Sequence, residues 1–193
     1  MGKNSADKDP DRYYDQISEG YEELHKEEQE KKLATVKDLL IRYGFKKQGF
    51  AERDPKSNLQ KLKLLDVGCG TGITSDFAEF GFDITGLDPA EKLLDRCMLP
   101  IRKICAEAED MPLPDKEFDI VASITAIQNF RDIEKGMEEI RRVGNDNALF
   151  ALTFLKRSAK REKITSLIKN MFDIKEEIEE DKEIIFVCSK KQV

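Results

Sequence analysis

The sequence predicts an α/β fold: a doubly wound, mainly parallel sheet of seven strands, with an N-terminal helical cap and a C-terminal antiparallel hairpin. Short apolar runs alternate with amphipathic helical patterns, which is typical of a parallel sheet covered by helices. The run Leu64–Val67 precedes glycines at alternating positions and then a helical pattern, the order that opens nucleotide-binding sheets. Two strand patterns, Phe172–Ile178 and Ile184–Cys188, flank a charged turn and predict the hairpin.

The N-terminal part of the chain is predicted to be helical. Apolar and aromatic residues recur there at helical spacing in two segments: Tyr14, Ile17, Tyr21 and Leu24, then Leu33, Val36, Leu40 and Tyr43. The charge run over residues 27–32 is expected to form a solvated helix face. A polar connector follows, so we divide the chain into a helical cap with its linker, residues 1–58, and a core, residues 59–193, within one domain.

The core pattern can be followed strand by strand. We expect strands over residues 62–67, 82–87, 101–106, 118–124, 147–155, 172–178 and 184–188. Helices are expected over residues 71–80 and 89–97, where Pro89 suits a first helical turn. Two further helices carry the apolar sets Ile133, Met137, Ile140 and Ile164, Leu167, Ile168, Met171. An acidic, proline-containing loop, residues 107–116, takes the place of another helix.

Composition limits the function classes. The chain has 193 residues, enough for one domain, and its net charge of −6 disfavours general DNA binding. The cysteines have no metal-type spacing, so we expect reduced thiols and no bound metal: Cys69, Cys97, Cys105 and Cys188. No N-terminal apolar segment and no run of membrane-spanning length is present, which predicts a cytoplasmic protein that does not enter the membrane.

The glycine turn indicates an adenosine ligand. Gly68, Gly70 and Gly72 form G-x-G-x-G, which departs from the G-x-G-x-x-G spacing used for a dinucleotide pyrophosphate. This spacing disfavours a nicotinamide dehydrogenase. Asp88 follows about 20 residues later at the end of the second strand, where a carboxylate can accept both ribose hydroxyls. Asp88 can also cap the helix that starts at Pro89, and one carboxylate can do both.

Four segments together resemble class I S-adenosylmethionine-dependent methyltransferases, in particular the type 11 group: Leu64–Ile73, Gly86–Asp88, Glu107–Pro114 and Phe118–Val121. The resemblance covers about residues 60–155 and implies a Rossmann-like seven-stranded sheet whose last strand is inserted antiparallel. It implies S-adenosyl-L-methionine as cofactor and S-adenosyl-L-homocysteine as product. The implied cofactor contacts are Tyr14, Tyr21, Asp66, Gly68, Cys69, Gly70, Thr71, Gly72, Asp88, Pro89, Glu107, Ala108, Glu109 and Ser123.

Within that set, Asp88 would hold the ribose and the loop that starts at Glu107 would face the adenine. Taken alone, this loop is better explained as an acidic surface segment. Tyr14 and Tyr21 resemble aromatic residues that cover the cofactor in the family. Two departures stand out: residues 144–147 replace the family's Lys-Pro-Gly-Gly, and the frequent histidine after the fourth strand is missing.

The acceptor side is expected to lie in residues 125–130, because ligands of doubly wound sheets bind beyond the strand ends. Thr125, Gln128 and Asn129 are the candidate positioning residues; the last two can equally be a polar cluster at a helix start. The Asn/Asp-Pro-Pro-aromatic motif of amino-group methylation is absent. The only histidine, His25, is expected at the surface of the N-terminal helix, where it would not act as a base.

Residues 123–128 are similar to the corresponding segment of small-subunit rRNA guanine-N7 methyltransferases. That similarity implies RNA or a translation component as acceptor, and a small zinc-binding activator protein as partner. Two alternatives stay open: a small-molecule methyltransferase, and a non-catalytic subunit that keeps the S-adenosylmethionine fold.

Overall fold

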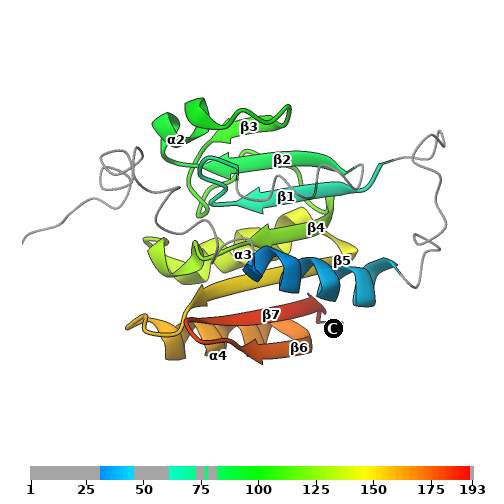
Figure 1. The fold of residues 1–193 in the computed structure, drawn as a ribbon, viewed down its shortest axis with the longest axis vertical. Helices are drawn as coiled ribbons and strands as arrows, with labels where there is room; N and C mark the ends of the chain where they lie inside the picture. The colour runs from blue at the N-terminus through cyan, green and yellow to red at the C-terminus, as the bar shows by residue number, and fades with distance from the viewer. Residues whose placement is uncertain (1–30, 46–60, 73–76, 78–81, 192–193) are drawn as a thin grey trace, which may run out of the picture.

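One seven-stranded sheet forms the centre of the fold, and helices cover both of its faces (Figure 1). The computed structural model describes residues 31–45, 61–72, 77 and 82–191. The strand order is β3-β2-β1-β4-β5-β7-β6. The strands are β1 Lys63–Val67, β2 Asp83–Asp88, β3 Arg102–Cys105, β4 Phe118–Ser123, β5 Gly144–Leu155, β6 Phe172–Glu179 and β7 Glu183–Lys190.

The strand directions confirm the predicted fold class. Strands β1 to β5 pair in parallel, whereas β7 runs antiparallel to both β5 and β6. The chain builds outward from β1 to β3 on one side and then returns to place β4 on the other side of β1. The reversal between β1 and β4 is the point at which sheets of this class bind their ligands, beyond the carboxyl ends of the strands.

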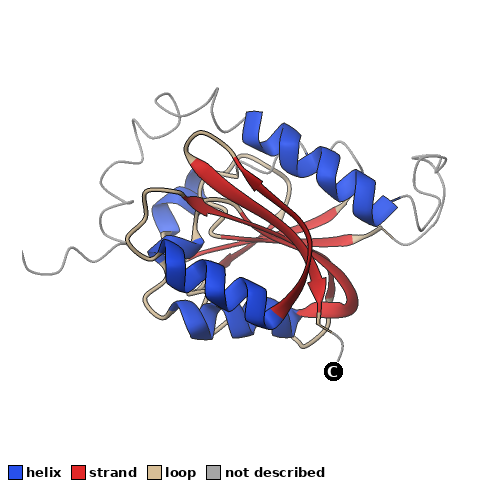
Figure 2. Cartoon of the chain, turned by 90° about the horizontal axis from the view of Figure 1, so that it is seen from below, coloured by secondary structure: helices blue, strands red, loops and turns tan. Residues whose placement is uncertain are grey.

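The helices form two outer layers, one on each side of the sheet (Figure 2). Residues 31–40 are helical and continue as a π-helix, η1 Ile41–Phe45. The others are α2 Glu91–Arg96, the 3-10 helix η4 Ile127–Asn129, α3 Ile133–Val143 and α4 Arg161–Met171. Asp132 caps α3, since its Oδ1 accepts hydrogen bonds from Glu134 N at 3.1 Å and Lys135 N at 3.3 Å.

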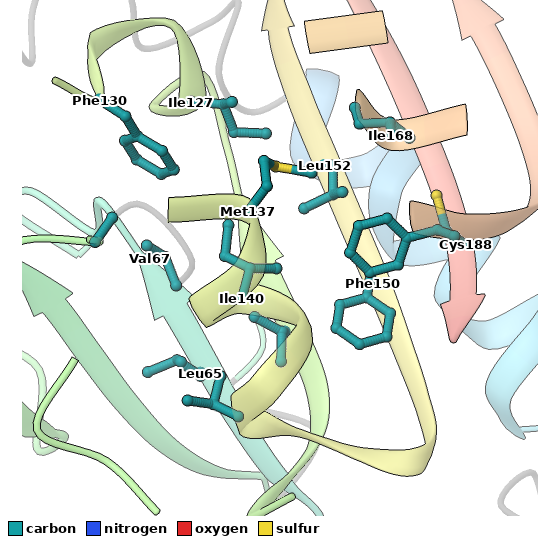
Figure 3. Close-up of a cluster of buried hydrophobic side chains, with 14 of the residues drawn as sticks. Leu65, Val67, Ile127, Phe130, Met137, Ile140, Phe150, Leu152, Ile168 and Cys188 are labelled. Atoms are coloured by element: carbon teal, nitrogen blue, oxygen red, sulfur yellow. The ribbon is translucent and has the colours of Figure 1, made fainter. Parts of the chain in front are cut away.

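Alternate residues of the strands supply two separate cores. On one face, Leu65 and Val67 of β1 and Phe150 of β5 pack against Met137 and Ile140 of α3 (Figure 3). On the other face, the helix of residues 31–40 packs against the sheet. Its buried apolar residues are Leu33, Val36, Leu39 and Leu40. The helix of residues 31–40 is therefore part of the same packed unit as the sheet.

The structure differs from the expected elements in a few places. β5 begins at Gly144, three residues before the expected start, and its register against β4 shifts between Phe118 and Ile120. Within the added residues, Asn147 N donates to Asn145 Oδ1 at 2.9 Å. α2 starts at Glu91, two residues later than expected. Cys105 is exposed on the edge strand β3. The helix expected over residues 71–80 lies mostly outside the described residues.

Candidate functional site

The glycine turn is fastened to the end of the neighbouring strand. Gly68, Gly70 and Gly72 have φ of +79°, +54° and +94°, the left-handed region in which glycine carries no steric cost. Gly68 N donates to Leu87 O at 2.7 Å, and Cys69 N donates to the same oxygen at 3.1 Å. The turn therefore holds the carboxyl ends of β1 and β2 together at the site edge.

Packing inside the protein also requires glycine at two of these positions. A Cβ on Gly68 would lie 2.3 Å from the Cβ of Ala126, and one on Gly72 would lie 2.7 Å from Cys97 Sγ. From the sequence, the glycines were explained by a ligand that lies close to the backbone. The structure adds a second reason, because Gly68 lies directly against the segment that follows β4.

Asp88 joins the glycine turn to the start of α2. It ends β2 and is only 7% exposed. Its Oδ2 accepts a hydrogen bond from Gly70 N at 2.8 Å, and its Oδ1 accepts one from Ala90 N at 2.9 Å. A carboxylate can accept about four hydrogen bonds, so these two are compatible with a ribose held by the same group. The expected cap is wrong in detail, because α2 has Ala90 as its N-cap without a side-chain cap bond, and Asp88 binds the backbone just before the helix. The ligand role of Asp88 stays a prediction.

Three other expected cofactor residues lie at the ends of β1 and β4. Asp66 is 2% exposed and is the penultimate residue of β1. Burial raises the pKa of the Cys69 thiol well above its ordinary value, and the charges of Asp66 and Asp88 raise it further. Cys69 is therefore a neutral thiol and a poor nucleophile. Ser123 is buried and donates to Val67 O at 3.0 Å, which ties β4 to β1.

The loop expected to face the adenine is attached to the start of α3. Glu109 Oε1 accepts a hydrogen bond from Asp132 N at 2.9 Å, and Glu107 pairs with Arg131 at 2.7 Å. Ala108 is buried in the core. The acidic side chains of the loop therefore stabilise its attachment to α3, independently of any contact with a ligand. Thr71 and Pro89, the remaining expected cofactor residues, are half-buried beside this edge.

Arg142, in the last turn of α3, binds the same loop through the loop's carbonyl oxygens. This residue was not identified from the sequence. Its Nη1 donates to Leu113 O at 2.7 Å and its Nη2 to Met111 O at 3.1 Å. Glu139 holds the guanidinium through Nε at 2.6 Å. A basic residue in the last turn of a helix is usually explained by its favourable interaction with the helix dipole. The sequence therefore carried no signal for a contact with the loop.

The acceptor-side segment after β4 is a tight turn built by hydrogen bonds. Thr125 has φ of +58°, and its N–H donates to the hydroxyl of Thr153 at 2.8 Å. Gln128 Nε2 donates to Thr125 O, and Asn129 N donates to Ala126 O at 2.8 Å. The Gln128 amide is thus used locally, as expected for a polar cluster at a helix start. The structure does bring this segment against the glycine turn, through Ala126 and Gly68.

A buried ion pair lies beside Thr125. Lys32 Nζ is 2.5 Å from Glu183 Oε1, and the two side chains are 3% and 5% exposed. The Thr125 hydroxyl donates to the same Glu183 oxygen at 2.9 Å and accepts a hydrogen bond from Lys32. The expectation that residues 27–32 form a solvated face is wrong at Lys32. Glu183, expected in a charged turn, is also buried, because both groups neutralise each other.

Two expected cofactor residues, Tyr14 and Tyr21, and the expected surface residue His25 lie outside the described residues. Within the described part of the chain, no group of three or more His, Cys, Asp or Glu side chains could hold a metal ion. No helix described in the structure is long and apolar enough to span a membrane.

Residues 65–152 match the family model of a methyltransferase domain. That range spans the glycine turn, Asp88 and the segment after β4. This segment is therefore similar to a methyltransferase domain, in agreement with the resemblance seen in the four sequence segments. The solved structure of a candidate S-adenosyl-L-methionine-dependent methyltransferase from Methanococcus maripaludis has the same fold, with a TM-score of 0.66. The two chains are 14% identical, and the match covers 100% of this chain and 98% of that one.

Several curated relatives that match this segment are named as methyltransferases of small molecules. The ubiquinone biosynthesis O-methyltransferase of Azorhizobium caulinodans is 26% identical over 67% of this chain and 52% of the relative. The sterol 4-C-methyltransferase strm-1 of Caenorhabditis elegans is 32% identical over 44% of this chain and 28% of the relative. The chain spans about half the length of the ubiquinone enzyme. These comparisons give no support to the expected similarity to rRNA guanine-N7 methyltransferases.

The residues present fit the cofactor of this methyltransferase class, S-adenosylmethionine. The Gly70 position is not crowded by the protein, since an added Cβ would make only an ordinary van der Waals contact, with Leu93 Cδ1 at 3.9 Å. The Asp88 carboxylate lies one hydrogen bond away from that same glycine. A glycine turn beside a strand-end carboxylate suits a nucleoside that has no phosphate.

Proposed function

We propose that this protein transfers a methyl group from S-adenosylmethionine to a small-molecule acceptor. The observation that carries the proposal is the junction of Asp88, Gly70 and Ala90 at the carboxyl end of β2, inside the matched methyltransferase domain. The names of the ubiquinone and sterol methyltransferase relatives favour a small molecule over a macromolecule. An RNA acceptor and a zinc-binding activator stay predictions from the sequence.

The residues divide into a cofactor side and an acceptor side. Asp88 and the backbone of Gly68 to Gly72 would hold the ribose and the methionine chain, with the loop that starts at Glu107 toward the adenine. Residues 125–130 would border the acceptor, because they follow β4 and lie against Gly68. The proximity of Ala126 to Gly68 supports this division, because the two proposed sides are then neighbours.

The cofactor supplies a methyl group activated by its positive sulfur, so the protein mainly has to align the acceptor with it. A covalent enzyme intermediate at the glycine turn is disfavoured, because the Cys69 thiol is buried and neutral. We therefore propose direct transfer to the acceptor. The part of the site that sets the alignment is the hydrogen-bonded turn around Thr125.

Calorimetric titration with S-adenosylmethionine and S-adenosylhomocysteine tests the proposal, and the absence of binding to both would refute it. Asp88→Ala should weaken binding by about 1–3 kcal/mol, the loss expected for hydrogen bonds to a charged acceptor. Asp83→Ala is the matched control, because Asp83 is exposed at the opposite end of the same strand. Equal affinities for the two variants would remove Asp88 from the cofactor site.

A further inference from the structure

Lys32, Thr125 and Glu183 form a buried polar cluster at the carboxyl edge of the sheet. They come from three separate parts of the fold: the N-terminal helix, the turn after β4 and the first residue of β7. Glu183 pairs in register with Leu155, the last residue of β5. Because β7 is antiparallel, its first residue lies at the edge where the parallel strands end. The cluster is thus on the acceptor side of the glycine turn.

The two carboxylate oxygens of Glu183 have different surroundings. Oε1 is 2.9 Å from the Thr125 hydroxyl and 2.5 Å from Lys32 Nζ. Oε2 is buried and has no hydrogen-bond partner among the described residues. A buried carboxylate oxygen without a hydrogen-bond donor is energetically unfavourable. If Glu183 only linked the N-terminal helix to the turn after β4, Oε1 alone would be sufficient. The second oxygen calls for a donor from outside the described chain.

The neighbouring turn directs that donor toward the methyl-transfer site. Thr125 keeps a left-handed backbone, φ +58°, which is uncommon for a threonine and is fixed by its hydrogen bonds to Thr153 and Glu183. The next residue, Ala126, lies against Gly68 of the glycine turn. A molecule that reaches Glu183 along Thr125 would therefore lie next to the residues proposed to hold the cofactor.

We propose that Glu183 Oε2 accepts the proton of a hydroxyl on the methyl acceptor; this rests on the proposed function. The acceptor's O–H bond breaks and its proton moves to Glu183. An O–CH₃ bond forms while the S–CH₃ bond breaks, and that electron pair stays on sulfur, which loses its positive charge. Glu183 then returns the proton to water. Lys32 balances the carboxylate charge between turnovers.

The base strength of a carboxylate selects the class of acceptor. Proton transfer is efficient when the donor's pKa is not far above that of the base. A phenolic hydroxyl, with a pKa of about 10, meets this condition much better than an aliphatic alcohol does. The proposed acceptors are therefore small phenols. The Thr125 hydroxyl and Lys32 orient the carboxylate and are positioning residues.

The test compares Glu183→Gln with a matched control, Glu179→Gln. Glu179 ends β6 in the same hairpin, pairs with Lys156 at 2.6 Å and is half exposed. Tritium-labelled S-adenosylmethionine and a mixture of phenol, catechol and 3,4-dihydroxybenzoate serve as probes. Glu183→Gln should lower kcat by about 100-fold or more, the range for loss of a general base. Its affinity for S-adenosylmethionine should stay within about twofold of the wild type.

Two readouts separate proton transfer from a merely structural role. The deficit of Glu183→Gln should shrink as the pH approaches about 10, where a phenol ionises without a base. Catechol binding to protein saturated with S-adenosylhomocysteine, measured by calorimetry, should weaken about tenfold or more, the effect of losing a hydrogen bond to a charged acceptor. The double variant K32M/E183Q removes the unbalanced lysine; it should keep wild-type stability and remain inactive.

Several results would overturn this inference. One is full activity of Glu183→Gln on the phenol that the wild type methylates. Another is a deficit that is the same at every pH and is restored in K32M/E183Q. A wild-type protein that binds S-adenosylmethionine and methylates other metabolites but no phenol would overturn the inference and leave the proposed function intact. Failure to bind S-adenosylmethionine would overturn both.

Discussion

Replacement of Gly68 by alanine tests whether the glycine turn and the acceptor segment are in contact. Gly68 has φ of +79°, and the left-handed region costs about 1–2 kcal/mol for a residue with a Cβ. The new Cβ would be 2.3 Å from the Cβ of Ala126, far inside the about 3.5–4.0 Å separation of favourable carbon contacts. Such overpacking adds about 1–3 kcal/mol. We expect Gly68→Ala to destabilise the fold by about 2–5 kcal/mol in total.

The two contributions can be separated with two further variants. Gly70→Ala should lose only the free energy of the left-handed backbone, since φ at Gly70 is +54°. It introduces no clash, because the nearest atom to the new Cβ is 3.9 Å away. The double variant G68A/A126G removes the clash, since the next atom of residue 126, its Cα, is 3.7 Å from the new Cβ. Both should lose only about 1–2 kcal/mol, apart from the small entropic cost of the second glycine.

Equilibrium urea unfolding measures these differences, and calorimetry with S-adenosylmethionine shows whether cofactor affinity follows them. If G68A/A126G is no more stable than Gly68→Ala, the contact between turn and segment is not the source of the cost. If Gly70→Ala is as damaging as Gly68→Ala, the backbone conformation alone explains the effect. Either result would refute the steric argument.

Two further predictions concern groups away from the acceptor. Glu139→Gln should destabilise the protein at pH 7 by about 1–3 kcal/mol, because it weakens the hydrogen bonds to Arg142. That hydrogen bond lowers the pKa of Glu139 from its ordinary 4.5, so the native contribution is complete above this pH and is lost as the pH falls through the lower folded-state value. Urea unfolding of wild type and variant should converge at acid pH. In thiol titration of the folded protein, exposed Cys105 should react quickly and Cys188, whose pKa burial raises to about 12, only after unfolding.

The sequence predicted the sheet well because buried parallel strands have a strong local signature. β1, β2 and β4 are almost entirely buried and carry clusters of apolar residues, and the three glycines mark the turn after β1 without ambiguity. Asp88 could be placed at the end of β2 for the same reason. The antiparallel position of β7 between β5 and β6 came with the family resemblance, because strand order is a long-range property that local patterns do not contain.

Charged residues were the main failure, and the reason is physical. A run such as residues 27–32 is normally solvated, and only a partner far away in sequence makes burial of one member favourable. Lys32 finds Glu183 on β7, and Arg142 finds the carbonyls of Met111 and Leu113. These contacts depend on tertiary structure alone, so periodicity and composition could not reveal them.

Packing also explains why a short similarity at residues 123–128 carries little information about the acceptor. Ser123 bonds to Val67 O, Thr125 N bonds to Thr153, and Ala126 fills the space that Gly68 leaves open. Small side chains and backbone groups make all three contacts, and they fasten the segment to β1 and β5. Packing in this fold therefore restricts the residue types here before any acceptor is bound. Substrate information must lie instead in the side chains brought against the segment from elsewhere, such as Glu183.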